Sequence, residues 1–151
     1  MKRSEVIAAQ AQVKQQLEGA GLALTPETTI EIADFGLNRF AQEGLGIVIR
    51  SNETEYCSKW LTLFPGQECP VHYHKMKKET FFALEGEVEL VADGQTITLL
   101  PGQNYTLKPG VNHSFRSTAG AVIEEVSTHD ENSDSYFEDP NIVRDPIVEE
   151  D

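Results

Sequence analysis

Residues 66–86 read GQECPVHYHKMKKETFFALEG, and this stretch decides the fold. His72 and His74 are two positions apart, so in a β-strand both imidazole rings project from the same face. Glu79 follows on the next strand after a short connector. Gly66 and Gly86 fall where the chain has to turn. The stretch therefore predicts two neighbouring strands that bring two histidines and a glutamate to one point.

A second block supplies a third histidine. It begins at Gly102, turns at Pro109-Gly110 and reaches His113. Three neutral imidazoles and one carboxylate form a good ligand set for a divalent transition metal, and they leave room for water or a substrate. We therefore expect a single metal site made by His113 together with His72, His74 and Glu79.

Short apolar runs alternate with turn signals through most of the chain, which is typical of a β-sandwich or barrel. Asp93-Gly94 is the strongest hairpin signal among the turns. A helix over residues 4–19 is expected to end at Gly19-Ala20-Gly21. The expected strands cover residues 47–49, 57–64, 81–84, 88–91, 97–100, 105–107, 113–115 and 121–126. We divide the chain into an N-terminal helical extension packed on the barrel (1–40), a barrel (44–128) and a C-terminal acidic tail partly packed on the barrel (129–151).

Charge and composition exclude several classes of partner. The 151 residues carry a formal net charge of -13, from 25 acidic and 12 basic residues, which argues against nucleic acid and anionic membranes. No apolar run approaches the ~18 residues of a membrane span, and no signal peptide is recognisable. We expect a cytoplasmic protein in which Cys57 and Cys69 are reduced, buried thiols. The tail ending at residues 149–151 is expected to fray.

The spacing of glycines and histidines resembles the cupin superfamily, which implies an all-β, single jelly-roll barrel. A narrower resemblance, to the D-lyxose ketol-isomerase family, runs over most of the chain. The shared stretches are Asp34-Phe35-Gly36-Leu37, Tyr56-Cys57-Ser58-Lys59, Leu63 to Gln67, Cys69 to His74, Lys78-Glu79-Thr80-Phe81 and Phe137-Glu138-Asp139-Pro140. The chain is more compact than relatives that carry longer insertions around the two histidine blocks.

The resemblance implies an enzyme that isomerises D-lyxose to D-xylulose, D-mannose to D-fructose, or both. The reaction would move a proton through an enediolate stabilised by a divalent metal, Mn2+ by preference, with Zn2+, Fe2+, Co2+ or Ni2+ as other candidates. The metal ligands of the family correspond to the four residues named above. Glu125 corresponds to the proton-transfer base and Lys59 to a lysine of the catalytic site. Lys78 and Arg144 are the expected substrate-binding residues, and a homodimer is expected from the fold.

Several alternatives stay open at this point. Period-two alternation sends one of Glu124 and Glu125 into the barrel and the other to solvent, without deciding which. Lys59 is equally compatible with a surface lysine, and Arg144 with a surface or interface ion pair. For function, one alternative is a metal-containing cupin that binds a sugar without converting it, as the compact loops suggest. The other is an Fe(II) dioxygenase, because the same four ligands serve that chemistry.

Overall fold

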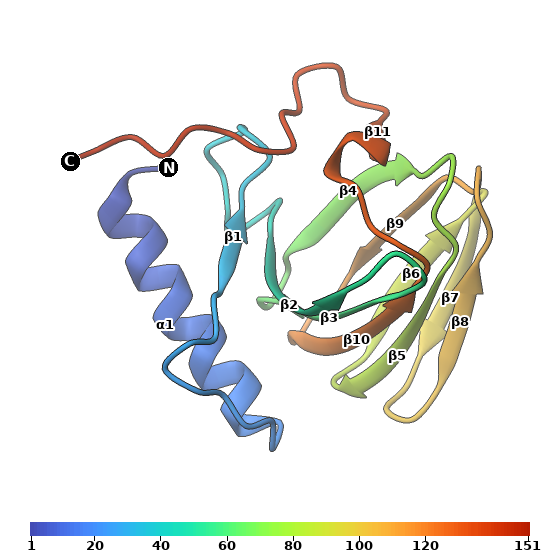
Figure 1. Ribbon diagram of the computed structural model, residues 1–151, viewed down its shortest axis with the longest axis horizontal. Helices are drawn as coiled ribbons and strands as arrows, with labels where there is room; N and C mark the ends of the chain where they lie inside the picture. The colour runs from blue at the N-terminus through green and yellow to red at the C-terminus, as the bar shows by residue number, and fades with distance from the viewer.

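The computed structural model describes residues 1–151 and consists of two antiparallel sheets, one α-helix and one short 3-10 helix (Figure 1). The elements in chain order are α1 (Arg3–Gly19), β1 (Glu31–Ala33), β2 (Leu45–Asn52), β3 (Cys57–Leu63), β4 (Glu68–Tyr73), β5 (Glu79–Glu85), β6 (Val88–Ala92), β7 (Gln95–Leu99), β8 (Asn104–Leu107), β9 (His113–Arg116), β10 (Ala121–Ser127), η1 (Asn132–Asp134) and β11 (Tyr136–Phe137). The all-β fold and the expected strands are confirmed, whereas β1, η1 and β11 were not anticipated. None of the helices is both long and apolar enough to cross a bilayer.

The strand order follows a jelly roll. One sheet runs β1-β2-β3-β10-β5-β8 and the other runs β11-β4-β9-β6-β7. Strands that are distant in sequence therefore become neighbours, since β10 lies between β3 and β5 and β9 lies between β4 and β6. The β4–β9 register places His72 directly opposite His113. This pairing brings the two histidine blocks of the sequence together.

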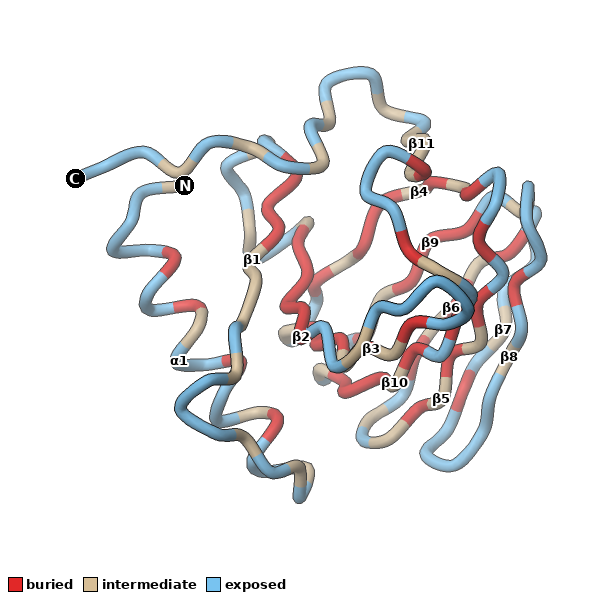
Figure 2. The backbone as a smooth tube through the Cα atoms, in the orientation of Figure 1, coloured by how far each residue is buried: buried red, intermediate tan, exposed pale blue.

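The core lies between the two sheets, where one side of each strand faces inward. Along β5, buried and half-buried residues alternate from Glu79 to Ala83, as the period of a strand requires. Seventeen buried residues form the main apolar cluster, with Phe81, Leu61 and Phe115 among them. Figure 2 shows this buried lining inside the barrel and a narrower buried stripe along α1.

The helix α1 covers the outer face of the larger sheet. Val13 and Leu17 are fully buried there and form a second cluster with Val48 and Val122. Gly46 makes the close approach possible, because a Cβ at this position would lie 2.7 Å from Val13 Cγ2. The helix is thus fixed by packing on the barrel, and it lies away from the barrel interior.

The C-terminal tail does not fray as expected. Its last residues return to the start of α1, so both chain ends lie close together in Figure 1. The N–H of Arg3 donates to the carbonyl oxygen of Glu149 at 2.8 Å, and Arg3 forms an ion pair with Glu150 at 2.9 Å. A frayed end is expected when the backbone has no partner, and here basic residues of the helix supply one. Exposed ion pairs of this kind contribute at most about 1 kcal/mol each.

Gly86 ends β5 in a conformation that only glycine accommodates. Its φ is +77°, and a Cβ would lie 2.1 Å from the carbonyl oxygen of Gly120. Gly66 has a similar φ of +79° but open space around its Cβ position. We expect Gly86→Ala to lower the free energy of unfolding by clearly more than Gly66→Ala, which carries only the backbone strain of about 1 kcal/mol. Urea denaturation of both variants checks this, and equal losses would contradict it.

Candidate metal centre and active site

Three histidine rings meet inside the barrel at one end. His72 lies on β4, His74 directly follows that strand, and His113 begins β9. All three side chains are buried. One nitrogen of each ring lies within 4.8 Å of the corresponding nitrogens of the other two. The structure thus brings together the three histidines that the sequence singled out.

Backbone carbonyl groups fix how each ring presents its nitrogens. The Nδ1 atoms of His72, His113 and His74 lie 2.7, 2.9 and 3.0 Å from the carbonyl oxygens of Pro70, Val111 and Asp134, respectively. A carbonyl oxygen only accepts, so each Nδ1 carries the proton and each Nε2 keeps a free lone pair. Such outer hydrogen bonds are what orient histidine ligands in metal sites. The rings are therefore held in the tautomer that a metal requires.

Glu79 lies beside two of these rings and is the fourth candidate metal ligand. Its Oε1 lies 3.0 Å from Nε2 of His113 and 3.4 Å from Nε2 of His74. Even so, both of these ring nitrogens and Oε1 of Glu79 are buried without a hydrogen-bond partner, while Oε2 has only an ion contact with Lys77. Leaving such atoms unsatisfied costs about 1–3 kcal/mol each, and a bound cation would satisfy all of them. The residues present therefore fit a divalent metal.

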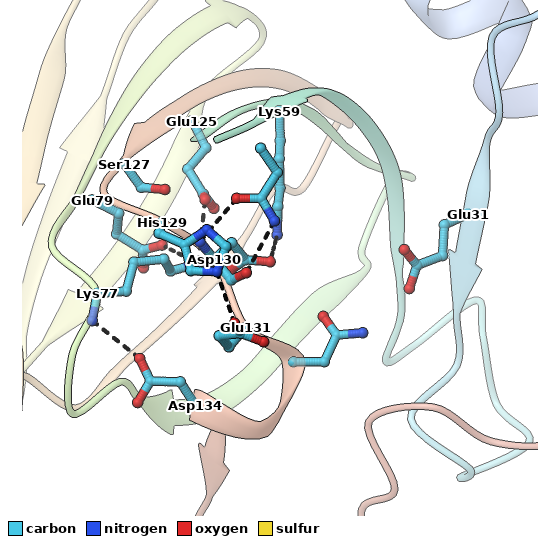
Figure 3. Close-up of polar contacts among 12 residues, drawn as sticks. Glu31, Lys59, Lys77, Glu79, Glu125, Ser127, His129, Asp130, Glu131 and Asp134 are labelled. Atoms are coloured by element: carbon cyan, nitrogen blue, oxygen red, sulfur yellow. Dashed lines mark hydrogen bonds and ion pairs between the residues drawn. The ribbon is translucent and has the colours of Figure 1, made fainter. Parts of the chain in front are cut away.

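A buried ion network surrounds Lys77 and includes Glu79 (Figure 3). The Nζ of Lys77 lies 2.9 Å from Oδ1 of Asp130, 3.0 Å from Oε2 of Glu79 and 3.3 Å from Oε2 of Glu125. Lys59 donates to Oδ2 of Asp130 at 2.8 Å. All five side chains are buried. Two lysines thus balance most of the charge of three carboxylates beside the metal donors.

The network sets the protonation of its members. Burial by itself would raise the pKa of Glu79, but the nearby Lys77 ammonium holds it well below its usual range. Burial and the nearby Glu79 charge raise the pKa of Glu125. Burial, together with the neighbouring rings of His113 and His74, holds the pKa of His72 well below its usual range. Neutral imidazoles and an ionised Glu79 are the forms that bind metals, while a more basic Glu125 is suited to proton transfer.

The direction of the two glutamates on β10 is decided by the structure. Glu125 is buried and lines the cavity that contains the histidines. Glu124 points to the outer face of the sheet, where Arg50 donates to it at 3.0 Å. Glu125 therefore has access to a molecule inside the barrel, and Glu124 does not.

Of the two expected substrate-binding residues, Lys78 and Arg144, only Arg144 lines the cavity. Lys78 is exposed and does not line the cavity, so this geometry does not support it as a substrate-binding residue. Arg144 does line the cavity, and its guanidinium is paired with Glu31 at 2.8 Å and with Asp145 at 3.2 Å. Lys59, which had been equally compatible with the surface, is buried in the cavity wall.

Lys77 and Asp130 were not anticipated from the sequence. A signal for Lys77 exists, because continuing the alternation of β5 backward from the buried Glu79 turns Lys77 inward and Lys78 outward. No comparable signal exists for Asp130, which follows the end of β10 and is turned inward by an irregular segment. Apolar side chains, including Leu61 and Phe137, also line the cavity, and the Phe137 ring packs against His72 with ring centroids 5.2 Å apart.

Comparisons with known proteins match this chain to cupins and to sugar isomerases. The cupin domain family matches residues 59–126. The chain is 35% identical to a D-lyxose/D-mannose isomerase of Thermosediminibacter oceani, with 99% of each chain covered. It is 34% identical to a D-lyxose ketol-isomerase of Cohnella laeviribosi, covering 99% of this chain and 98% of that one.

Solved structures share the architecture at low sequence identity. The L-ribose isomerase of Cellulomonas parahominis with L-ribose aligns over 100% of this chain and 98% of its own, with a TM-score of 0.85 and 15% identity. The L-ribose isomerase of Geodermatophilus obscurus aligns over 93% and 94%, with a TM-score of 0.82 and 17% identity. At this level of identity the likeness establishes the fold alone.

Proposed function

We propose that this chain, a sugar isomerase that belongs to the D-lyxose ketol-isomerase family of cupins, converts D-lyxose to D-xylulose, D-mannose to D-fructose, or both. The observation that carries the proposal is the position of Glu125. It is a buried carboxylate with a raised pKa, in the same cavity as three histidine Nε2 atoms and Glu79. An aldose–ketose isomerase needs a base of this kind beside a centre that stabilises negative charge on the sugar oxygens.

The reaction moves one proton between neighbouring carbons. Glu125 takes the proton from C2 of the open-chain aldose and returns it to C1, while a proton passes from O2 to O1. A divalent metal held by His72, His74, Glu79 and His113 would supply Lewis-acid stabilisation of the two sugar oxygens. We expect Mn2+ from the family, and Zn2+, Fe2+, Co2+ and Ni2+ suit the same donors.

Besides neutralising the buried carboxylates, the lysine ammonium groups of the cavity can stabilise negative charge on the sugar. Lys77 contacts both Glu79 and Glu125, so its charge lies between the metal donors and the base. A hydrogen bond from Lys77 to a sugar oxygen would strengthen as negative charge develops there. Lys59 acts one step further out, because its Nζ is engaged by Asp130. Arg144 remains the candidate for the far end of the sugar.

The charge of the cavity favours an uncharged sugar. Every basic side chain that lines it is already paired with a carboxylate, since Lys59 and Lys77 contact Asp130 and Arg144 contacts Glu31. A sugar phosphate would need a free cationic group to bind. A neutral pentose or hexose needs only hydrogen bonds and the apolar wall.

Metal removal tests the proposed function. Protein stripped with a chelator should lose ketose formation from D-lyxose and D-mannose, and added Mn2+ should restore it, because the sugar oxygens otherwise lack their stabilising charge. Ketose release is measured with both sugars, and L-ribose serves as a comparison that shares C2 and C3 with D-lyxose but differs at C4. Bound Mn2+ without turnover on any of these sugars would contradict the proposed reaction.

The expected homodimer stays a prediction, and the molar mass in solution measured by light scattering checks it.

A further inference from the structure

Asp134 joins two segments that are far apart in sequence. It ends η1, in the stretch between β10 and β11, and its side chain is buried. Its partners belong to the connector between β4 and β5, residues 74–78, which carries one candidate metal ligand and Lys77. Figure 3 shows Asp134 on one side of Lys77 and the carboxylates of the ion network on the other. Neither the proposed metal site nor the proton transfer uses Asp134 directly.

The carboxylate of Asp134 holds the backbone of the connector. Its Oδ1 accepts the N–H of Lys75 at 2.9 Å and that of Met76 at 3.2 Å. Its Oδ2 accepts the N–H of Met76 at 3.1 Å and that of Lys77 at 3.1 Å. Three consecutive backbone donors therefore converge on one ionised side chain. Charge-assisted hydrogen bonds of this kind are about twice as strong as neutral ones.

The backbone of the same residue holds a side chain of the connector. The carbonyl oxygen of Asp134 accepts the Nδ1–H of His74 at 3.0 Å. The other two histidines instead use carbonyl groups two residues before themselves. His74 is thus the one ring of the cluster whose orientation depends on a segment distant in sequence.

These contacts bear on Lys77 because its position depends on the connector. The connector has no strand or helix of its own between β4 and β5. The Lys77 backbone is held by Asp134 on one side, while its Nζ reaches Glu79, Glu125 and Asp130 on the other. If the backbone of residues 75–77 were free to move, the ammonium group would lose its fixed place between the three carboxylates.

We propose that Asp134 is a positioning residue that fixes His74 toward the metal and Lys77 toward the substrate. This inference rests on the proposed function for the role of Lys77, and on the donor set alone for the role of His74. Both effects come from the same residue, since its carboxylate holds the backbone of residues 75–77 and its carbonyl oxygen accepts from His74. Loss of the carboxylate acts directly on Lys77 and, through the loosened connector, also on His74. Asp134 itself touches neither the metal nor the sugar.

The test compares Asp134→Ala and Asp134→Asn with wild type. Both variants keep the carbonyl oxygen that accepts from His74. Removing the carboxylate loosens the connector that follows His74, so Mn2+ binding should weaken by about 10-fold, the lower end of the effect of losing an outer partner of a metal ligand. In Mn2+-saturated protein, kcat with D-lyxose should fall by more than KM rises, because Lys77 acts on charge that develops during the reaction. Asparagine keeps one accepting oxygen and should give an intermediate loss. Mn2+ affinity is measured by titration with electron paramagnetic resonance detection of the free ion.

Two control variants separate positioning from general stability. Asp139→Ala removes a similar carboxylate that accepts the N–H of Asn141 at 2.9 Å and lies outside the cavity. Val13→Ala lowers stability at the helix without touching the site. The inference is overturned if Asp134→Ala has the same Mn2+ affinity and kcat as Asp139→Ala. It is also overturned if Val13→Ala lowers Mn2+ affinity and kcat as much as Asp134→Ala does. Wild-type protein that binds Mn2+ but turns over no sugar overturns the proposed function, and the Mn2+ affinities then still decide the role of Asp134.

Discussion

Replacing Glu125 with glutamine should leave Mn2+ binding unchanged and lower kcat by about 10²- to 10⁴-fold, the range that a positioned general base contributes. Glutamine has nearly the same shape and can still accept a hydrogen bond from Lys77, but it cannot take a proton from C2. The measurements are kcat for D-lyxose and the incorporation of deuterium into the sugar recovered from D2O. Both should fall together, because both require removal of the same proton.

Glu124→Gln provides the matched control for this prediction. Glu124 is the adjacent residue on the same strand and has the same chemistry, but it pairs with Arg50 on the outer face of the sheet. We expect its kcat and its deuterium incorporation to stay close to wild type. Wild-type deuterium incorporation by Glu125→Gln would assign the base to another group. Loss of Mn2+ binding in that variant would mean that Glu125 supports the donor set instead.

Replacing Lys77 with methionine should both destabilise the protein and abolish turnover. Lys77 is 4% exposed and contacts Glu79, Glu125 and Asp130, so its removal leaves buried carboxylates without a cation. Breaking a buried ion pair by removing one partner costs about 3–5 kcal/mol. We expect a loss of this size in the free energy of unfolding of the metal-free protein, measured by urea denaturation. A variant that still folds should bind sugar but not convert it at an appreciable rate.

The neighbouring Lys78 supplies the control. Lys78→Met makes the same chemical change one residue later, at an exposed position outside the cavity. Its stability and kcat should both stay near wild type, since exposed charges contribute at most about 1 kcal/mol. A larger effect on kcat from Lys78 than from Lys77 would restore Lys78 as a substrate-binding residue. Unchanged stability in Lys77→Met would mean that the three carboxylates do not depend on this ammonium group.

Much of the fold followed from local pattern. Short strands with regular turns predicted the barrel, because the alternation of apolar residues and the glycine turns are properties of neighbouring residues. The segments β1, η1 and β11 escaped prediction because each has only two or three residues, too few to show a period. The ordered end of the acidic tail was not predicted for another reason. Its partners Lys2 and Arg3 lie at the opposite end of the sequence.

The sequence by itself pointed to the donors of the proposed metal centre, since His72, His74, Glu79 and His113 are recognisable from type and spacing. It also limited the proposed base to one of two adjacent glutamates. Only the tertiary structure decided which of the two glutamates faces the cavity. Only the tertiary structure revealed that Lys77 and Asp130 pair with each other in the cavity beside Glu125. Spacing along a strand fixes relative faces, and the choice of inner face depends on packing against the other sheet. The contacts of Asp134 show most clearly what only the tertiary structure decides, because Asp134 and its partners are separated by 57–60 positions in the sequence.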